Sequence, residues 1–156
     1  MALRLNEKDA GMTAGNVRSG GCLCGSVRFA IQVPEARFNV CHCGMCRRWC
    51  GGPFLAVHCE AGADFASGGG LAWYRSSKWG ERGFCRNCGT SLFWRLADDP
   101  AAMLAVSAEA FDDAADLKLD RHIYIDHKPA RYDFADDRPR LTEAEILAEF
   151  GATPGA

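Results

Sequence analysis

Cysteine side chains dominate the groups in this sequence that could do chemistry. Nine of the 156 residues are cysteines, and seven of them fall into three short clusters. The clusters are Cys22-Leu23-Cys24, Cys41-His42-Cys43-Gly44-Met45-Cys46 and Cys85-Arg86-Asn87-Cys88. Thiols so closely spaced are typical of metal ligands in a reducing compartment, and an odd total fits a set of disulfides poorly. The sequence therefore predicts metal coordination.

The first and third clusters each supply two thiols followed directly by a glycine, Gly25 or Gly89. Glycine permits a turn at positive φ, in which backbone amides can face sulfur. Zinc prefers four ligands in a closed tetrahedron, which two cysteine pairs supply. Four thiolates also suit iron–sulfur chemistry, but the spacing favours zinc. We therefore predict one structural zinc site, with the ligands Cys22, Cys24, Cys85 and Cys88.

The middle cluster offers three thiols within six residues: Cys41, Cys43 and Cys46. Three cysteines leave a zinc ion one ligand short, which is typical of a site with an exchangeable position. Such a position could accept an incoming thiol and hold it as the nucleophilic thiolate. Zinc with three thiolates carries a net charge of −1, and the adjacent Arg47 and Arg48 could offset it.

Other interpretations of the middle cluster stay open. Cys50 could complete a closed site. His42 could do the same, although neighbouring residues on an extended segment point in opposite directions. The thiols could also be metal-free and redox-active. Cys59 stands apart from the clusters, and we interpret it as a core residue.

Short strands must position these cysteines. Apolar residues alternate from Val27 to Val33, which is the period of a half-buried strand, and Pro34 follows. Many short strands separated by turns predict a mainly β fold. The further strand candidates cover residues 37–40, 53–58, 71–75, 81–84, 90–95, 102–108 and 121–125.

The clearest helix signal lies near the C-terminus. Thr142 is suited to the N-cap, Glu145 stands three residues later, and Gly151 can end the helix. A shorter helix at 109–116 is a weaker prediction. Together these signals suggest a flexible segment at 1–18, one zinc-binding domain at 19–136, and a tail with a short helix at 137–156.

Composition excludes several classes of protein. The formal charge is −2 and the pI about 6.1, so the chain lacks the basic footprint of a general nucleic-acid binder. The N-terminus carries charges and no apolar signal-peptide core. No stretch approaches the roughly eighteen apolar residues of a membrane span. We expect a cytoplasmic protein with no nucleic-acid or membrane partner.

The order of these motifs resembles the glutathione-dependent formaldehyde-activating (Gfa) family, which includes centromere protein V. The resemblance runs from about Gly20 to Asp136. The matching segments are Gly21-Cys22-Leu23-Cys24-Gly25-Ser26-Val27-Arg28-Phe29, Cys41-His42-Cys43-Gly44-Met45-Cys46-Arg47-Arg48, Tyr74-Arg75-Ser76-Ser77, Arg82-Gly83-Phe84-Cys85-Arg86-Asn87-Cys88-Gly89-Thr90-Ser91-Leu92, His122-Ile123-Tyr124 and Lys128-Pro129.

The resemblance implies an Mss4-like β-tent of several small coiled antiparallel sheets that carries two zinc sites. It implies that the first and third clusters bind the structural zinc and that Cys41, Cys43 and Cys46 bind a catalytic zinc. The implied activity is that of an S-(hydroxymethyl)glutathione synthase, a carbon–sulfur lyase. One position departs from the family, because Arg131 stands where many relatives have an aromatic residue.

We therefore expect an enzyme that joins a small aldehyde such as formaldehyde to the thiol of glutathione or a related small thiol, or releases it. Arg47, Arg48 and Arg75 are the candidates for binding the glutathione carboxylates, because arginine pairs with carboxylate bidentately. Two alternatives come from other classes: a zinc-stapled binding module without catalysis, and a thiol or zinc redox sensor.

Overall fold

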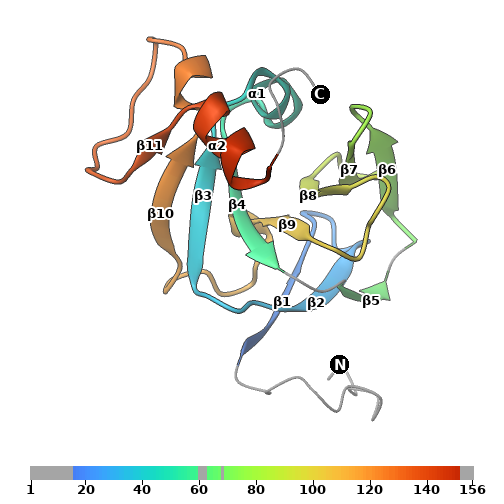
Figure 1. Ribbon diagram of the computed structural model, residues 1–156. Coiled ribbons are helices and arrows are strands. Elements are labelled where there is room, and N and C mark those ends of the chain that lie inside the picture. Colours follow the sequence, from blue (N-terminus) through green and yellow to red (C-terminus); the bar gives the residue numbers. More distant parts are fainter. Residues whose placement is uncertain (1–15, 60–62, 68, 152–156) are drawn as a thin grey trace.

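The computed structural model describes residues 16–59, 63–67 and 69–151, and in this part of the chain two β-sheets carry two short α-helices (Figure 1). Its elements are β1 (Val17–Gly21), β2 (Arg28–Gln32), β3 (Arg37–Cys41), α1 (Gly44–Cys50), β4 (Phe54–Cys59), β5 (Asp64–Ser67), β6 (Leu71–Arg75), β7 (Gly80–Cys85), β8 (Ser91–Leu96), β9 (Leu104–Ser107), β10 (Lys118–Ile123), β11 (Arg140–Leu141) and α2 (Glu143–Glu149). Single 3-10 turns cover Ala108–Ala110 and Ile125–His127.

The smaller sheet has the antiparallel order β1-β2-β5, and the larger sheet has the order β11-β10-β3-β4-β9-β8-β7-β6. This confirms the mainly β prediction. The larger sheet also contains two parallel pairings, β10 with β3 and β10 with β11. A parallel pairing needs a long crossover between its strands, and local alternation of residues does not reveal it.

Apolar side chains pack between the two sheets. Phe29 of β2 lies edge-on to Phe93 of β8 and to Phe111, with ring centroids 5.1 and 5.8 Å apart. Cys59 belongs to this core and is 1% exposed, as predicted. A second, smaller cluster surrounds Cys41 and Cys46 on the larger sheet. The middle cysteine cluster is therefore built into a core of its own.

The helices and the strand boundaries test the predictions further. All the predicted strands are present within a few residues, and α2 begins with the predicted capping box between Thr142 and Glu145. The predicted helix at 109–116 is wrong, because only the turn at Ala108–Ala110 forms before an extended Phe111. Helix α1 and strands β1, β5 and β11 were not predicted. None of the helices among the described residues is long and apolar enough to cross a bilayer.

Each end of the described chain contributes a strand to a sheet. Strand β1 begins at Val17, inside the segment expected to be flexible, because its backbone pairs with β2 from Val17 to Gly21. Residues 1–15 of that segment lie outside the described residues. The tail is attached to the domain, since β11 extends the larger sheet beside β10.

Candidate metal centres

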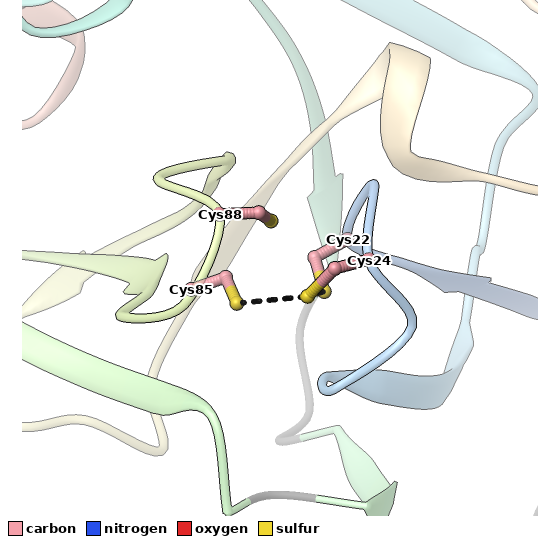
Figure 2. A group of neighbouring side chains, drawn as sticks. All are labelled: Cys22, Cys24, Cys85 and Cys88. Atoms are coloured by element: carbon pink, nitrogen blue, oxygen red, sulfur yellow. Dashed lines mark hydrogen bonds between the residues drawn. The ribbon is translucent and has the colours of Figure 1, made fainter.

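The first and third cysteine clusters converge on one point between the two sheets (Figure 2). Cys22 and Cys24 lie in the turn between β1 and β2, Cys85 ends β7, and Cys88 lies in the turn before β8. Their four sulfur atoms all lie within 4.8 Å of one another. We call this group the four-cysteine site. It lies where the β1–β2 turn of the smaller sheet meets the β7–β8 turn of the larger one.

The sulfur separations fit a tetrahedral ion. The Sγ atoms of Cys22 and Cys24 lie 3.6 Å apart, and those of Cys24 and Cys85 lie 3.7 Å apart. A disulfide needs about 2.05 Å, and all four thiols are free. Zinc–sulfur bonds of about 2.3 Å in a tetrahedron place the sulfurs about 3.8 Å apart. The donor set therefore fits zinc.

The glycines behave as the sequence predicted. Gly25 and Gly89 have φ values of 80° and 78°, in the left-handed region that side chains disfavour. Each glycine amide donates back to the carbonyl of the first cysteine of its pair. The tight turn also brings the Val27 amide to Cys22, where it donates to Sγ at 3.2 Å. The backbone thereby favours thiolate at this site.

Two hydroxyl groups flank the same sulfurs. The Thr90 hydroxyl lies 3.1 Å from Cys88 Sγ, and this hydrogen bond lowers the pKa of Cys88 to about 5. Ser26 lies 3.2 Å from Cys24 Sγ and lowers the pKa of that thiol in the same way. Metal ligands must be deprotonated, so these hydrogen bonds favour metal binding.

The middle cluster forms a second group, which we call the trio. Cys41 ends β3, Cys43 is the N-cap of α1, and Cys46 lies in the first turn of that helix. Their sulfurs lie within 4.8 Å of one another. The Cys46 amide donates to Cys43 Sγ at 3.3 Å, so the helix start itself fixes the central sulfur.

The three thiols share their protons unequally. Hydrogen bonds from Cys41 and then Cys46 lower the pKa of Cys43 to about 2. The reciprocal hydrogen bonds raise the pKa of Cys41 well above its ordinary value. Negative charge therefore concentrates on Cys43, and a bound cation can replace the protons on the other two sulfurs.

Neither candidate for a fourth ligand joins the trio. His42 is 0% exposed, and its ring nitrogens lie 3.1 Å from the Tyr132 hydroxyl and 2.9 Å from His122 Nδ1. Cys50 lies outside the set of sulfurs within 4.8 Å of one another. In the described part of the chain the trio thus has three ligand atoms, which is the donor set of an open zinc site.

A buried arginine beside the trio was not among the predicted site residues. Arg82 of β7 is 3% exposed, and its Nη1 donates to Cys46 Sγ at 3.5 Å. A buried charge is costly unless it has a partner of opposite sign. The trio, as thiolates, supplies that partner. No local sequence signal identified this role, because Arg82 and Cys46 belong to elements that meet only in the folded chain.

We expect Arg82→Met to weaken zinc binding at the trio about 10–100-fold, the usual cost of removing a group that supports metal ligands. Zinc with three thiolates is negative, so loss of the buried guanidinium removes its counter-charge. Competition with a chromophoric chelator measures the affinity. Arg86→Met, which removes an exposed arginine beside the four-cysteine site, is the control. Equal zinc affinities for Arg82→Met and the wild type would contradict this role.

Tyr124 also borders the trio. Its backbone adopts the left-handed conformation with φ of 54°, which is unusual for a tyrosine. Burial, and then the negative charge of the trio sulfurs, raise its pKa to about 12. The phenol therefore stays protonated near neutral pH and can donate a hydrogen bond.

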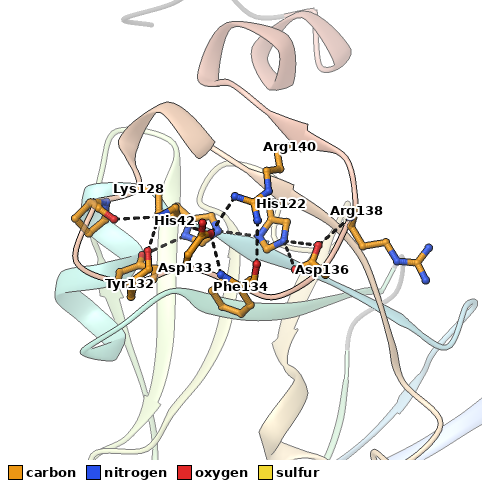
Figure 3. A network of polar contacts seen from close by, with 10 residues as sticks. His42, His122, Lys128, Tyr132, Asp133, Phe134, Asp136, Arg138 and Arg140 are labelled. Atoms are coloured by element: carbon orange, nitrogen blue, oxygen red, sulfur yellow. Dashed lines mark hydrogen bonds and ion pairs between the residues drawn. The ribbon is translucent and has the colours of Figure 1, made fainter.

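Hydrogen bonds connect His42, which lies between Cys41 and Cys43 in the sequence, to a series of neighbouring side chains (Figure 3). The Asp136 carboxylate lies 3.0 Å from His122 Nε2, so that nitrogen carries the proton. His122 Nδ1 then accepts from His42 Nε2, and His42 Nδ1 accepts from the Tyr132 hydroxyl. These hydrogen bonds fix the ring of His42, the residue between Cys41 and Cys43. They also connect His42 to Tyr132, which lines a pocket.

That pocket has a volume of about 570 Å³. Helix α1, the segment after it and the loop after β10 form its wall; the lining residues are Gly44, Arg47, Arg48, Gly51, Gly52, Pro53, Arg131 and Tyr132. We call it the arginine pocket. Two of the three arginines predicted to bind carboxylates line it. The third, Arg75, lies elsewhere on β6, where it donates to the Lys78 carbonyl and lies 3.4 Å from Asp98.

The fold has a counterpart among solved structures. A crystal structure of a Rhodobacter sphaeroides protein superposes with a TM-score of 0.52, covering 65% of this chain and 98% of that one at 22% sequence identity. This similarity concerns the fold alone.

Sequence comparison defines the class of protein. Residues 17–127 match the model of the glutathione-dependent formaldehyde-activating enzyme family. An uncharacterized lyase of Schizosaccharomyces pombe is 32% identical over 82% of this chain and 93% of its own length. A Halomonas elongata protein, named as a candidate glutathione-dependent formaldehyde-activating enzyme, is 30% identical over 70% of this chain and 76% of its own. The chain belongs to this family.

Proposed function

We propose that this protein is a carbon–sulfur lyase that joins a small aldehyde such as formaldehyde to the glutathione thiol, or releases it. The observation that carries the proposal is the trio, where three sulfurs converge without a fourth ligand atom among the described residues. Gly44, which follows Cys43 in the sequence, lines a pocket that also contains Arg47, Arg48 and Arg131. The family match and the lyase name of a relative support the same class of reaction.

The reaction requires a thiolate and an electrophilic carbonyl. A zinc ion held by Cys41, Cys43 and Cys46 would supply a vacant position that favours the thiolate form of an incoming thiol. The sulfur–carbon bond forms as the carbonyl π bond breaks, and the proton lost by the thiol ends on the new hydroxyl. The reverse sequence releases the aldehyde.

The residues around the trio have separate tasks. Arg82 offsets the negative charge that gathers on the sulfurs, since its guanidinium contacts Cys46. The protonated Tyr124 can donate a hydrogen bond to the oxygen that becomes negative during addition. Arg47 and Arg48 are placed to bind the glutathione carboxylates in the arginine pocket.

Cobalt substitution tests the proposal. Cobalt replaces zinc in cysteine sites, and its ligand-field spectrum reports a change of ligand. We expect glutathione to change the spectrum of the fully cobalt-loaded protein, whereas S-methylglutathione, whose sulfur has no acidic proton, should leave it unchanged. An unchanged spectrum at saturating glutathione, with two cobalt ions per chain, would refute thiol binding at the trio.

A further inference from the structure

The arginine pocket carries an excess of positive charge. Three guanidinium groups line it, from Arg47, Arg48 and Arg131, and its lining contains no carboxylate. Guanidinium groups gathered at one cavity repel one another unless an anion lies between them. The pocket is therefore suited to a ligand with several negative groups.

The same arginines lack protein partners of opposite charge. Within the described ranges none of the three has a carboxylate within 4 Å, whereas most other arginines do; these are Arg18, Arg28, Arg37, Arg75, Arg95, Arg121 and Arg140. The Nε of Arg47 donates to the His42 carbonyl at 2.9 Å. That bond orients its guanidinium and leaves the two terminal nitrogens for a ligand.

Glutathione alone does not match this charge. It offers two carboxylates and one ammonium group, and an ammonium is disfavoured beside three guanidinium groups when no lining carboxylate is present to receive it. Formaldehyde adds no charge. A third carboxylate on the ligand would match the third arginine.

We propose that the preferred carbonyl substrate is a short aldehyde that itself carries a carboxylate, so that its glutathione adduct has three carboxylates, and that Arg131 binds the added one. This inference rests on the proposed function and names its substrate class. The addition balances as before: the thiol sulfur bonds to the aldehyde carbon, the carbonyl π bond breaks, and the thiol proton ends on oxygen. No oxidant or reductant takes part.

The position of Arg131 favours this assignment. The next residue, Tyr132, places its hydroxyl 3.1 Å from His42 Nδ1, and His42 lies between two trio cysteines. The Tyr132 side chain thus connects the loop that carries Arg131 to His42 (Figure 3). The proposal assigns the added carboxylate to this loop, since the other two arginines of the pocket come from helix α1.

A pair of stable ligands tests the inference. S-(carboxymethyl)glutathione carries the third carboxylate, and S-(carbamoylmethyl)glutathione replaces it with a neutral amide of nearly the same shape. We expect calorimetric titration of zinc-loaded wild-type protein to give about tenfold tighter binding of the carboxymethyl ligand, as for one charge-assisted bidentate pair. Arg131→Gln should abolish this preference. Arg138→Gln, which removes an exposed arginine outside the pocket, should retain it.

The outcomes are distinguishable. Equal affinities of the two ligands for the wild type would overturn the inference while leaving glutathione as the thiol substrate. A preference that survives Arg131→Gln would overturn the role of Arg131. If neither derivative nor glutathione bound, the proposed function would fail as well. Thermal unfolding of each variant checks that these exposed substitutions leave the fold intact.

Discussion

Cys85→Ser is expected to prevent the domain from folding stably. Cys85 is 0% exposed and supplies one of four converging sulfurs, and serine is a poor zinc ligand. Binding of a structural zinc ion contributes an apparent free energy of about 10–16 kcal/mol to folding. The free energy of unfolding of a whole domain is only about 5–15 kcal/mol. Circular dichroism should show loss of the thermal transition, and elemental analysis should show loss of at least one zinc per chain.

Cys59→Ala is the matched control. Cys59 is equally buried, at 1% exposed, but its sulfur belongs to neither metal centre. Its replacement removes one buried sulfur from the core and should cost about 1 kcal/mol with the zinc content unchanged. A folded Cys85→Ser protein as stable as Cys59→Ala would contradict the structural role of the four-cysteine site.

Cys43→Ser is expected to abolish catalysis without unfolding the protein. Serine can accept the Cys46 amide hydrogen bond and is a favoured N-cap, so α1 should persist. The trio then keeps two thiols, and catalysed exchange of formaldehyde on glutathione should fall at least about 100-fold, beyond the usual loss for a supporting residue. Because formaldehyde also adds to thiols unaided, NMR exchange spectroscopy should be corrected for the uncatalysed rate.

Cys50→Ser provides the comparison. Cys50 ends the same helix but lies outside the trio, so exchange should continue at nearly the wild-type rate with two zinc ions per chain. Equal activity of Cys43→Ser and Cys50→Ser would refute a catalytic trio. A Cys43→Ser protein that still captured a protein partner, when the wild type showed no catalysed exchange, would favour the binding-module alternative.

The two groups of converging sulfurs could be predicted from the sequence because they are formed by rare residues at short spacing. Two cysteine pairs, each closed by a glycine, predicted both the convergence of four sulfurs and the positive φ of Gly25 and Gly89, and the structure has both. The strands were predictable for the same reason, since alternation of buried and exposed residues is a local signal.

The remaining features depend on contacts between distant segments. Arg82 approaches Cys46 because β7 and α1 lie together in space, a relation that neither segment encodes alone. The pairing of His42 with His122 spans eighty residues, and each histidine seen singly suggests only a core position. The parallel pairing of β3 with β10 likewise joins segments that are distant in the sequence. Helix α1 was missed because its N-cap is Cys43 and it lacks the capping box that identified the equally short α2.

The position of the four-cysteine site also constrains the order of events during synthesis. Cys22 and Cys24 leave the ribosome long before Cys85 and Cys88, so the first half-site can offer only two sulfurs to a metal during that interval. Closing the intervening loop costs entropy, which metal coordination by all four sulfurs would offset. A zinc ion at this site would therefore join the sheets only after the later pair is made, and a nascent chain that stops before Cys88 would hold three of the four sulfurs.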